Sequence, residues 1–128
     1  MKLRIKGDSL RLRVSPSEVR RLLEEGRVTE TVHFAPQADA KLTYALEVVA
    51  GAQADSLTVR YAAQEVAVLV PAALAREWVE GPEVGLYGHL PLPAGLLEIV
   101  VEKDFACLDR SDAENEDTYP NPKQGAVC

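Results

Sequence analysis

The clearest chemical pattern in the sequence is a set of five cations close to the N-terminus. Lys2, Arg4 and Lys6 alternate with apolar residues, and Arg11 and Arg13 do the same after a Gly-Asp turn. A period of two is typical of a β-strand with one buried face, and the turn has the composition of a tight hairpin. The sequence therefore predicts a hairpin that carries the five cations side by side on one face.

Such a basic face needs a counter-charge. Like charges opposite each other on paired strands cost a few tenths to about 1 kcal/mol per pair. Three alternatives would offset this cost: solvent and acids on neighbouring strands, the chain's own acidic C-terminal segment, or an external anion, which suits the planar guanidinium of arginine. The sequence has no glycine-rich phosphate loop to strengthen the third alternative. The candidate ligand-binding residues are Arg4, Lys6, Arg11 and Arg13.

The histidines and cysteines form a second candidate site. His33 and His89 lie near the ends of two expected strands, and Cys107 and Cys128 lie near the C-terminus. Imidazole and thiolate are ligands that zinc prefers, so His33, His89 and Cys107 are the candidate metal ligands. The spacing is not that of a zinc motif, because the chain has no CxxC and no HxxxH pattern. No cofactor is predicted, and zinc is the alternative.

The same residues define an alternative function, a small metal- or thiol-dependent enzyme that uses Cys107 with His33 or His89. A nucleophilic cysteine needs a depressed pKa and a nearby base. Acidic neighbours such as Asp104 and Asp109 raise the pKa of a thiol instead. We therefore favour a protein that is not an enzyme.

Composition and charge narrow the class of protein. The chain has 128 residues with 47% apolar side chains, which suits one domain with its own core. The net charge is −6, yet residues 1–27 hold eight bases against four acids and the rest carries −10. This acidity argues against nucleic-acid binding, which needs a basic footprint. Neither a membrane span of ~20 apolar residues nor a secretory signal is found, so we expect a cytoplasmic protein that does not bind membranes.

Two helices and eight strands are expected to position these residues. Ser15-Pro16-Ser17-Glu18 is a capping box with proline at the first helical position, so a helix should cover residues 16–25 and end at Gly26. A second helix should begin at Pro71 and end at Gly81-Pro82. The strands expected after the N-terminal hairpin are Val28–Phe34, Leu42–Val49, Leu57–Tyr61, Val66–Val70, Val84–Leu90 and Leu96–Lys103.

Each half of the chain then consists of a hairpin, a helix and a second hairpin. At an offset of 55 residues Pro16 matches Pro71 and Gly26 matches Gly81, whereas the strands before the helices need an offset of 56. This pattern is typical of an internal duplication, or of two units that share generic patterning. We predict an α+β fold of mainly antiparallel strands with two short helices. A duplicated hairpin–helix–hairpin unit would form two sheets or an eight-stranded barrel.

The periodicity ends at residue 103. From Asp104 on, the sequence is acidic and includes Tyr119-Pro120-Asn121-Pro122, which does not fit regular structure. We therefore predict a single α+β domain over residues 1–103. An acidic extended tail over residues 104–128 would pack on this domain or trail from it.

Both ends of the sequence resemble one family. The N-terminal stretch reads MKxRIKGxSxRxR, and the C-terminal part contains VEKDFxCL followed by YPNP. In these motifs the chain resembles an uncharacterised family of short bacterial proteins of unknown function, nearly end to end. The resemblance implies a compact single-domain protein, and it supplies no catalytic residue.

The main functional hypothesis is a non-enzymatic binding or interaction module. Its basic hairpin face would bind a small anion or an acidic protein, and the acidic tail would dock near that face and compete with the partner. The charge asymmetry between the two ends of the chain motivates this hypothesis. A further alternative is an accessory protein that works within a complex. The sequence leaves the oligomeric state open.

Overall fold

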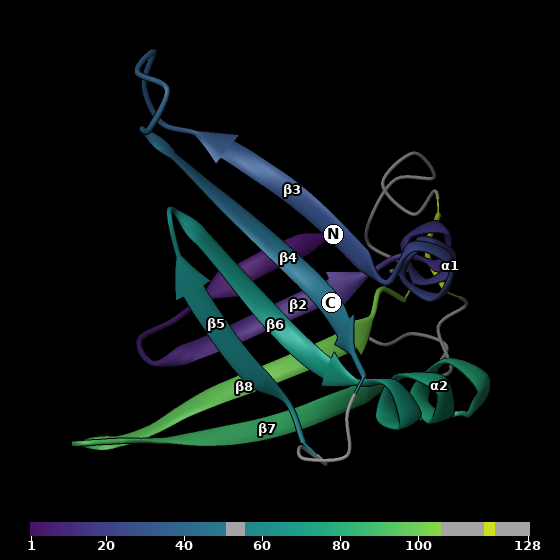
Figure 1. The fold of residues 1–128 in the computed structure, drawn as a ribbon. Helices are drawn as coiled ribbons and strands as arrows, with labels where there is room; N and C mark the ends of the chain where they lie inside the picture. Colours follow the sequence, from purple (N-terminus) through teal and green to yellow (C-terminus); the bar gives the residue numbers. More distant parts are fainter. Residues whose placement is uncertain (51–55, 106–116, 120–128) are drawn as a thin grey trace.

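The computed structural model describes residues 1–50, 56–105 and 117–119. These residues form two four-stranded sheets and two helices, which Figure 1 shows. Sheet A has the strand order β1-β2-β8-β7, with β1 (Lys2–Ile5), β2 (Ser9–Val14), β7 (Gly85–Leu92) and β8 (Gly95–Lys103). Sheet B has the order β3-β4-β6-β5, with β3 (Arg27–His33), β4 (Lys41–Val49), β5 (Thr58–Ala62) and β6 (Glu65–Pro71). The helices are α1 (Pro16–Glu25) and α2 (Ala72–Glu80).

Both sheets are mixed and open. The outer pairs of each sheet are antiparallel hairpins, whereas the central pairs β2–β8 and β4–β6 are parallel. The predicted α+β fold with two sheets is confirmed, and the described strands do not close into an eight-stranded barrel. The parallel pairs join strands from different halves of the chain, and a hydrophobic period of two carries no information about such pairing.

The two halves of the chain contribute equally to both sheets. The hairpin β1-β2 joins β7-β8 of the second half, and the hairpin β5-β6 joins β3-β4 of the first half. If each strand is replaced by its counterpart in the other half of the chain, β1-β2-β8-β7 becomes β5-β6-β4-β3, which is the order of sheet B. In the parallel pairs, Val14 lies opposite Lys103, and Val48 lies opposite Val70. Val70 follows Val14 by 56 residues and Lys103 follows Val48 by 55, so the pairing reproduces both offsets seen in the sequence. The topology has the symmetry that a duplication would produce, and the duplication itself stays a prediction.

The core lies between the inner faces of the two sheets and beneath the helices. Trp78 of α2 is its largest fully buried side chain, and Leu22 of α1 is also fully buried. The other large, fully buried side chains are Leu12, Val14, Leu46, Leu57, Val68, Val70, Ile99 and Val101. Figure 1 shows both helices at one end of the molecule, while the β3-β4 and β7-β8 hairpins diverge at the opposite end.

The first helix begins and ends as its sequence predicts. The Ser15 hydroxyl accepts the Glu18 N–H, and the Glu18 carboxylate accepts the Ser15 N–H. Gly26 ends α1 with a φ of 79°, a left-handed conformation that favours glycine. In contrast, α2 begins one residue later than predicted, because Pro71 still belongs to β6. Of the described helices, neither is long and apolar enough to span a membrane.

A glycine permits the two sheets to approach each other at one edge. Leu57, which precedes β5, is fully buried and contacts Gly88 of β7. A Cβ atom at residue 88 would lie 2.9 Å from the Leu57 Cβ, which is closer than side chains pack. Gly88 therefore brings an edge strand of sheet A against the segment that leads into an edge strand of sheet B.

Few residues of the expected tail are described. The Tyr119 N–H donates to the Asp104 carbonyl, and the rings of Phe105 and Tyr119 are 5.8 Å apart. Residues 106–116 and 120–128 lie outside the described residues. The domain boundary at residue 103 and the extended tail therefore stay predictions.

Candidate functional site

The predicted basic face is the outer surface of sheet A. The strand register places Lys2 opposite Arg13 and Arg4 opposite Arg11. Leu12 lies between the two arginines of β2 and is buried in the core. Since successive strand residues point to opposite faces, the four cations share the outer face. The hairpin and its register thus follow the sequence prediction.

Acidic residues neutralise one end of this face. The Glu102 Oε1 on β8 lies 2.8 Å from the Arg13 Nε and 3.7 Å from the Arg11 Nε. The Lys2 Nζ lies 3.0 Å from the Asp104 Oδ2. The first of the expected offsets, acids on a neighbouring strand, therefore acts on Arg13 and more weakly on Arg11.

Two of the four candidate ligand-binding residues are not neutralised in this way. Within the described part of the chain, neither Arg4 nor Lys6 forms an ion pair, and both are exposed. Arg4 lies directly opposite Arg11 in the register, so two arginine residues occupy facing positions at the centre of the hairpin. The structure brings Arg4, Arg11 and Arg13 together, and it places Lys6 just beyond the end of β1.

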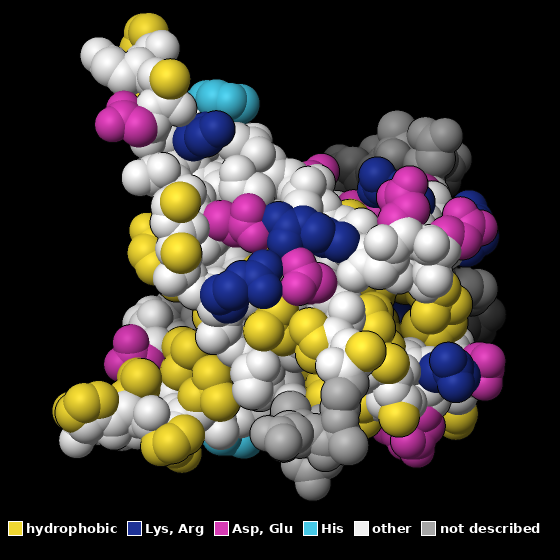
Figure 2. All heavy atoms as spheres, viewed as in Figure 1, with side chains coloured by type: hydrophobic (Ala, Val, Ile, Leu, Met, Phe, Trp, Pro, Cys, Tyr) yellow, Lys and Arg dark blue, Asp and Glu magenta, His cyan; other side chains and the backbone are white. Residues whose placement is uncertain are grey.

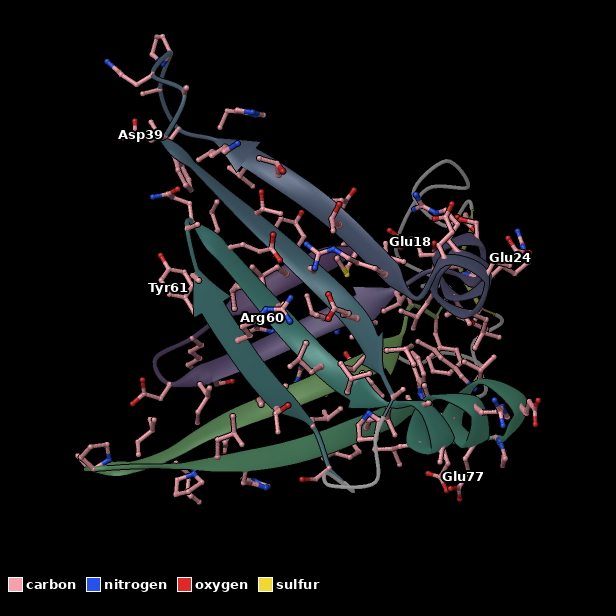
Figure 3. The ribbon with its side chains drawn as sticks, in the orientation of Figure 1. Glu18, Glu24, Asp39, Arg60, Tyr61 and Glu77 are labelled. Carbon is pink, nitrogen blue, oxygen red and sulfur yellow. The ribbon has the colours of Figure 1, made fainter. Side chains whose placement is uncertain are left out.

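The outer face of sheet B carries similar residues with their charges paired. Arg27 donates to Glu47 and to Glu65, both at 2.6 Å, and Arg60 donates to Glu47 at 3.1 and 3.2 Å. Each strand of the sheet supplies one residue, and Figure 2 shows alternating basic and acidic patches across the middle of this face. Figure 3 places Arg60 near its centre. These four residues form an ion-pair network without net charge.

Hydrogen bonding and small neighbours maintain this network. Hydrogen bonds from Arg60 and Arg27 lower the pKa of Glu47, and hydrogen bonds to the two carboxylates raise the pKa of Arg27. Ala45 and Ala67 lie opposite each other on the central strands, on the same face as the network, and both are fully buried. Their small side chains leave room for the guanidinium groups to reach across β4 and β6.

Superposing the first half of the chain on the second in register shows which residues make the charge of sheet A differ from that of sheet B. Arg4 of β1 occupies the position that Arg60 occupies in β5. Ser9 of β2 occupies the position of Glu65 in β6. Sheet A therefore has a matching arginine and a matching first carboxylate, Glu102, but a hydroxyl where sheet B has its second carboxylate. Gly85 also stands opposite Glu102 where Arg27 stands opposite Glu47, so these exchanges alone leave sheet A without excess charge. Its excess positive charge comes from Arg11 and Arg13, which occupy the positions of Ala67 and Leu69.

A polar hollow of about 350 Å³ adjoins the basic face at the N-terminal end of α1. Its lining consists of Met1, Lys2, Arg13, Ser15, Ser17, Glu18, Arg21, Asp104 and Asp117. Asp117 accepts hydrogen bonds from the Ser17 hydroxyl and N–H, and these bonds lower its pKa. A carboxylate from the C-terminal part of the chain thus lies at the first turn of α1, in the hollow that Lys2 and Arg13 also line.

Glu18 is the buried acid of this hollow. It is 7% exposed, and its carboxylate contacts Ser15 and the N-terminal ammonium of Met1. Burial alone would raise the pKa of Glu18, but hydrogen bonds from the ammonium and from Ser15 outweigh burial and lower it. The same ammonium lies 3.1 Å from Glu30 of β3. This cluster connects the start of β1 to α1 and to sheet B.

The structure does not bring the two histidines together. His33 ends β3 in sheet B opposite Lys41, and His89 lies on β7 in sheet A opposite Glu98. Figure 1 shows the end of β3 and strand β7 on opposite sides of the molecule. The β7-β8 hairpin has a different register from β3-β4, so His89 takes the position of Thr31 and not that of His33.

The third candidate metal ligand, Cys107, lies outside the described residues. Among the residues that are described, no three metal-binding side chains gather at one place. The zinc site and the thiol-dependent enzyme therefore stay predictions without geometric support.

Lys103, at the end of β8, is the residue that the sequence analysis missed. It is 8% exposed, and its Nζ donates to the Gly81 carbonyl at 3.0 Å. The same atom lies 5.9 Å from the Trp78 ring centroid and 5.7 Å from that of Tyr119, distances typical of cation–π contacts. Burial lowers the pKa of Lys103. The sequence held a signal for this burial. Lys103 lies two residues after Val101 on the same strand, so it points to the same inward face as that buried valine.

Comparison with known proteins gives a family and no activity. The model of the family of unknown function DUF7009 matches residues 1–123. No curated protein and no solved structure matches the chain. The predicted relationship to an uncharacterised family is confirmed, and the chain belongs to the family of unknown function DUF7009.

Proposed function

We propose that this chain is a non-enzymatic binding module that binds an acidic segment of a partner protein on the outer face of sheet A. The contrast between the sheets carries this proposal. On sheet B every arginine of the network has a carboxylate within 3.1 Å, whereas on sheet A Arg4 faces Arg11. Unpaired surface cations attract acidic partners and speed their association. The sequence pattern supports a cytoplasmic location for this function.

The shape of the face favours an extended acidic segment over a small anion. Sheet A is open, so its arginines project from a surface and do not line a closed barrel. The pair Arg4 and Arg11 and the pair Lys2 and Arg13 are two residues apart along their strands, or about 7 Å. Acidic side chains at alternate positions of an extended peptide have the same spacing. Such a peptide contacts both pairs at once and gains from each.

Carboxylates of the chain itself lie at one edge of this face. Asp104 contacts Lys2, and Asp117 lies in the hollow that Lys2 and Arg13 line. We infer that acids of the C-terminal part compete with the partner for these two cations, because an intramolecular ligand has a high effective concentration. Asp117→Asn should therefore tighten binding of an acidic peptide.

Peptide binding to matched variants tests the proposal. A fluorescent peptide with glutamate at alternate positions should bind the full chain saturably at low salt, as measured by anisotropy. Arg4→Gln and Arg11→Gln should each weaken binding about three- to fivefold, which corresponds to the loss of one exposed charge pair. Arg76→Gln removes the same charge from the exposed face of α2 and should change little.

The salt dependence and the alternative ligand complete this test. Affinity should fall as salt shortens the Debye length from about 10 Å at 0.1 M to about 3 Å at 1 M. Absent peptide binding, or an equal loss in Arg76→Gln and Arg4→Gln, would contradict the proposal. Saturable binding of inorganic phosphate that depends on Arg4, without peptide binding, would favour the small-anion alternative.

A further inference from the structure

A second hollow, separate from the basic face, lies between α2 and the start of β7. Its volume is about 300 Å³, and its lining consists of Ser56, Leu74, Glu77, Trp78, Glu83, Gly85, Leu86 and Tyr87. A neighbouring hollow shares Glu83, Gly85 and Tyr87 with it. Apolar and aromatic walls with a few polar groups are typical of small-molecule sites, whose volumes begin at about 300 Å³.

Two carboxylates line this hollow. In the described part of the chain, neither Glu77 nor Glu83 forms an ion pair. Figure 3 shows the Glu77 side chain projecting from the lower side of α2. The charge of Glu83 acts on Lys103, but the Lys103 Nζ donates to the Gly81 carbonyl. One lysine against two carboxylates leaves the hollow with negative charge.

Aromatic rings form two of its walls. A hydrogen bond of 3.2 Å from the Trp78 Nε1–H to the Val84 carbonyl fixes the indole. Tyr87 is 65% exposed, although it is large and aromatic. Gly85 makes room for it, because a Cβ atom at residue 85 would lie 3.3 Å from the Tyr87 hydroxyl oxygen. An aromatic face beside a carboxylate attracts a cation more strongly than either group alone.

We propose that this hollow binds a small organic cation, that is, an ammonium or guanidinium group on an apolar body. The apolar body would pack against Leu74, which is partly exposed, and over the small part of Leu86 and Trp78 that reaches the hollow. The cationic group would lie beside Tyr87 and the carboxylates of Glu77 and Glu83. A neutral ligand would desolvate the carboxylates without compensation, and an anion would be repelled. This site is independent of the basic face and selects the opposite charge.

The single tryptophan of the chain reports on this site, because Trp78 lines it. The full chain is titrated at neutral pH with phenethylammonium while the Trp78 emission is recorded. Phenethyl alcohol and phenylacetate are neutral and anionic analogues of nearly the same shape. We expect saturable binding of the ammonium compound, and affinities at least about tenfold lower for both analogues, since each loses a charge-assisted contact.

Charge-removing variants test which carboxylates contact the ammonium group of the ligand. Glu83→Gln and Glu77→Gln should each weaken phenethylammonium binding about five- to tenfold. Glu80→Gln, at the end of α2 and outside the lining, is the matched control and should bind as the unchanged chain does. Thermal unfolding of each variant confirms that it is folded.

Four outcomes would overturn the proposal or its small-molecule assignment. The first is an absent Trp78 response to phenethylammonium at millimolar concentration. The second is equal binding of phenethyl alcohol, and the third is unchanged affinity in Glu83→Gln. Tighter binding of a lysine-containing peptide than of phenethylammonium would overturn the small-molecule assignment and point to a cationic side chain of a partner protein.

Discussion

Ser9 in β2 and Glu65 in β6 occupy equivalent positions in the two sheets. In sheet B, the Glu65 carboxylate completes the ion-pair network by accepting from Arg27. In sheet A, a hydroxyl stands at this position, and two arginines face each other nearby. Arg11 of β2 also stands where β6 has Ala67. At the scale of single residues, these two exchanges together make the outer face of sheet A more basic than that of sheet B.

Ser9→Glu should convert the basic face toward the neutral one. The new carboxylate lies on the same face of β2 as Arg11 and opposite Glu98 of β8, so it lowers the positive charge of this face and repels an acidic partner. We expect the affinity for the alternating glutamate peptide to fall about five- to tenfold, or 1–1.4 kcal/mol. Ser9→Gln adds similar bulk without charge, and an equal loss in this control would show that charge is not the cause.

Glu18 predicts how stability depends on pH. Its pKa in the folded chain lies below the ordinary value of about 4.3, because its ionised form is hydrogen bonded. Its contribution is therefore fully present above that value and is lost as the pH falls through the lower, folded pKa. Glu18→Gln should lower the free energy of unfolding at neutral pH by about 1–3 kcal/mol and flatten the loss of stability below about pH 5.

Urea unfolding at a series of pH values checks this prediction. Glu24→Gln is the matched control, because Glu24 is an exposed residue of the same helix, as Figure 3 shows. It should change the free energy of unfolding by less than about 0.5 kcal/mol. If the free energy of unfolding fell equally with decreasing pH in Glu18→Gln and in the unchanged chain, Glu18 would not be the cause of the acid sensitivity.

At the scale of elements, the contact between Gly88 of β7 and Leu57 is the most sensitive junction. Gly88→Ala places a Cβ atom within 2.9 Å of the Leu57 Cβ, so one of the two segments must move. We expect a loss of about 1–3 kcal/mol in the free energy of unfolding, the usual cost of overpacking. His89→Ala alters the next residue, which is exposed, and should cost less than about 0.5 kcal/mol. A Gly88→Ala variant of unchanged stability would contradict the close approach.

Local signals explain which elements the sequence predicted well. Ser15, Glu18 and Gly26 act within their own helix, and they set the bounds of α1 at the predicted residues. The second helix has no side-chain cap, and its start was misplaced by one residue. The pairing of β2 with β8 and of β4 with β6 was not predicted, because no local pattern states which hairpins meet.

The distinction between local signals and long-range contacts also applies to the candidate site. The basic face was predictable, because alternation and a tight turn lie within thirteen residues. The ion-pair network on sheet B was not predictable, since Arg27 of β3 reaches over β4 to Glu65 of β6, which is 38 positions away in the sequence. The hollow beside Tyr87 was missed although all but one of its lining residues lie between Leu74 and Tyr87, because no local pattern shows how the chain turns between α2 and β7.

At the scale of the whole molecule, two sheets of equivalent topology present different surfaces. The outer face of sheet B is neutral, that of sheet A is basic along β1 and β2, and the hollow beside α2 is acidic. A net charge of −6 describes none of these regions. The chain thus separates its charges in space, and each region selects a different kind of ligand.

The most direct test of the central proposal is to map peptide binding on the full chain by NMR. Amide chemical shifts are followed while the alternating glutamate peptide is added to the isotope-labelled protein. We predict that the largest changes occur in β1, β2 and the adjoining part of β8, with Arg4 and Arg11 among them, and that the outer face of sheet B is unaffected. Changes centred on Arg27 and Arg60, or no changes at saturating peptide, would contradict the proposal.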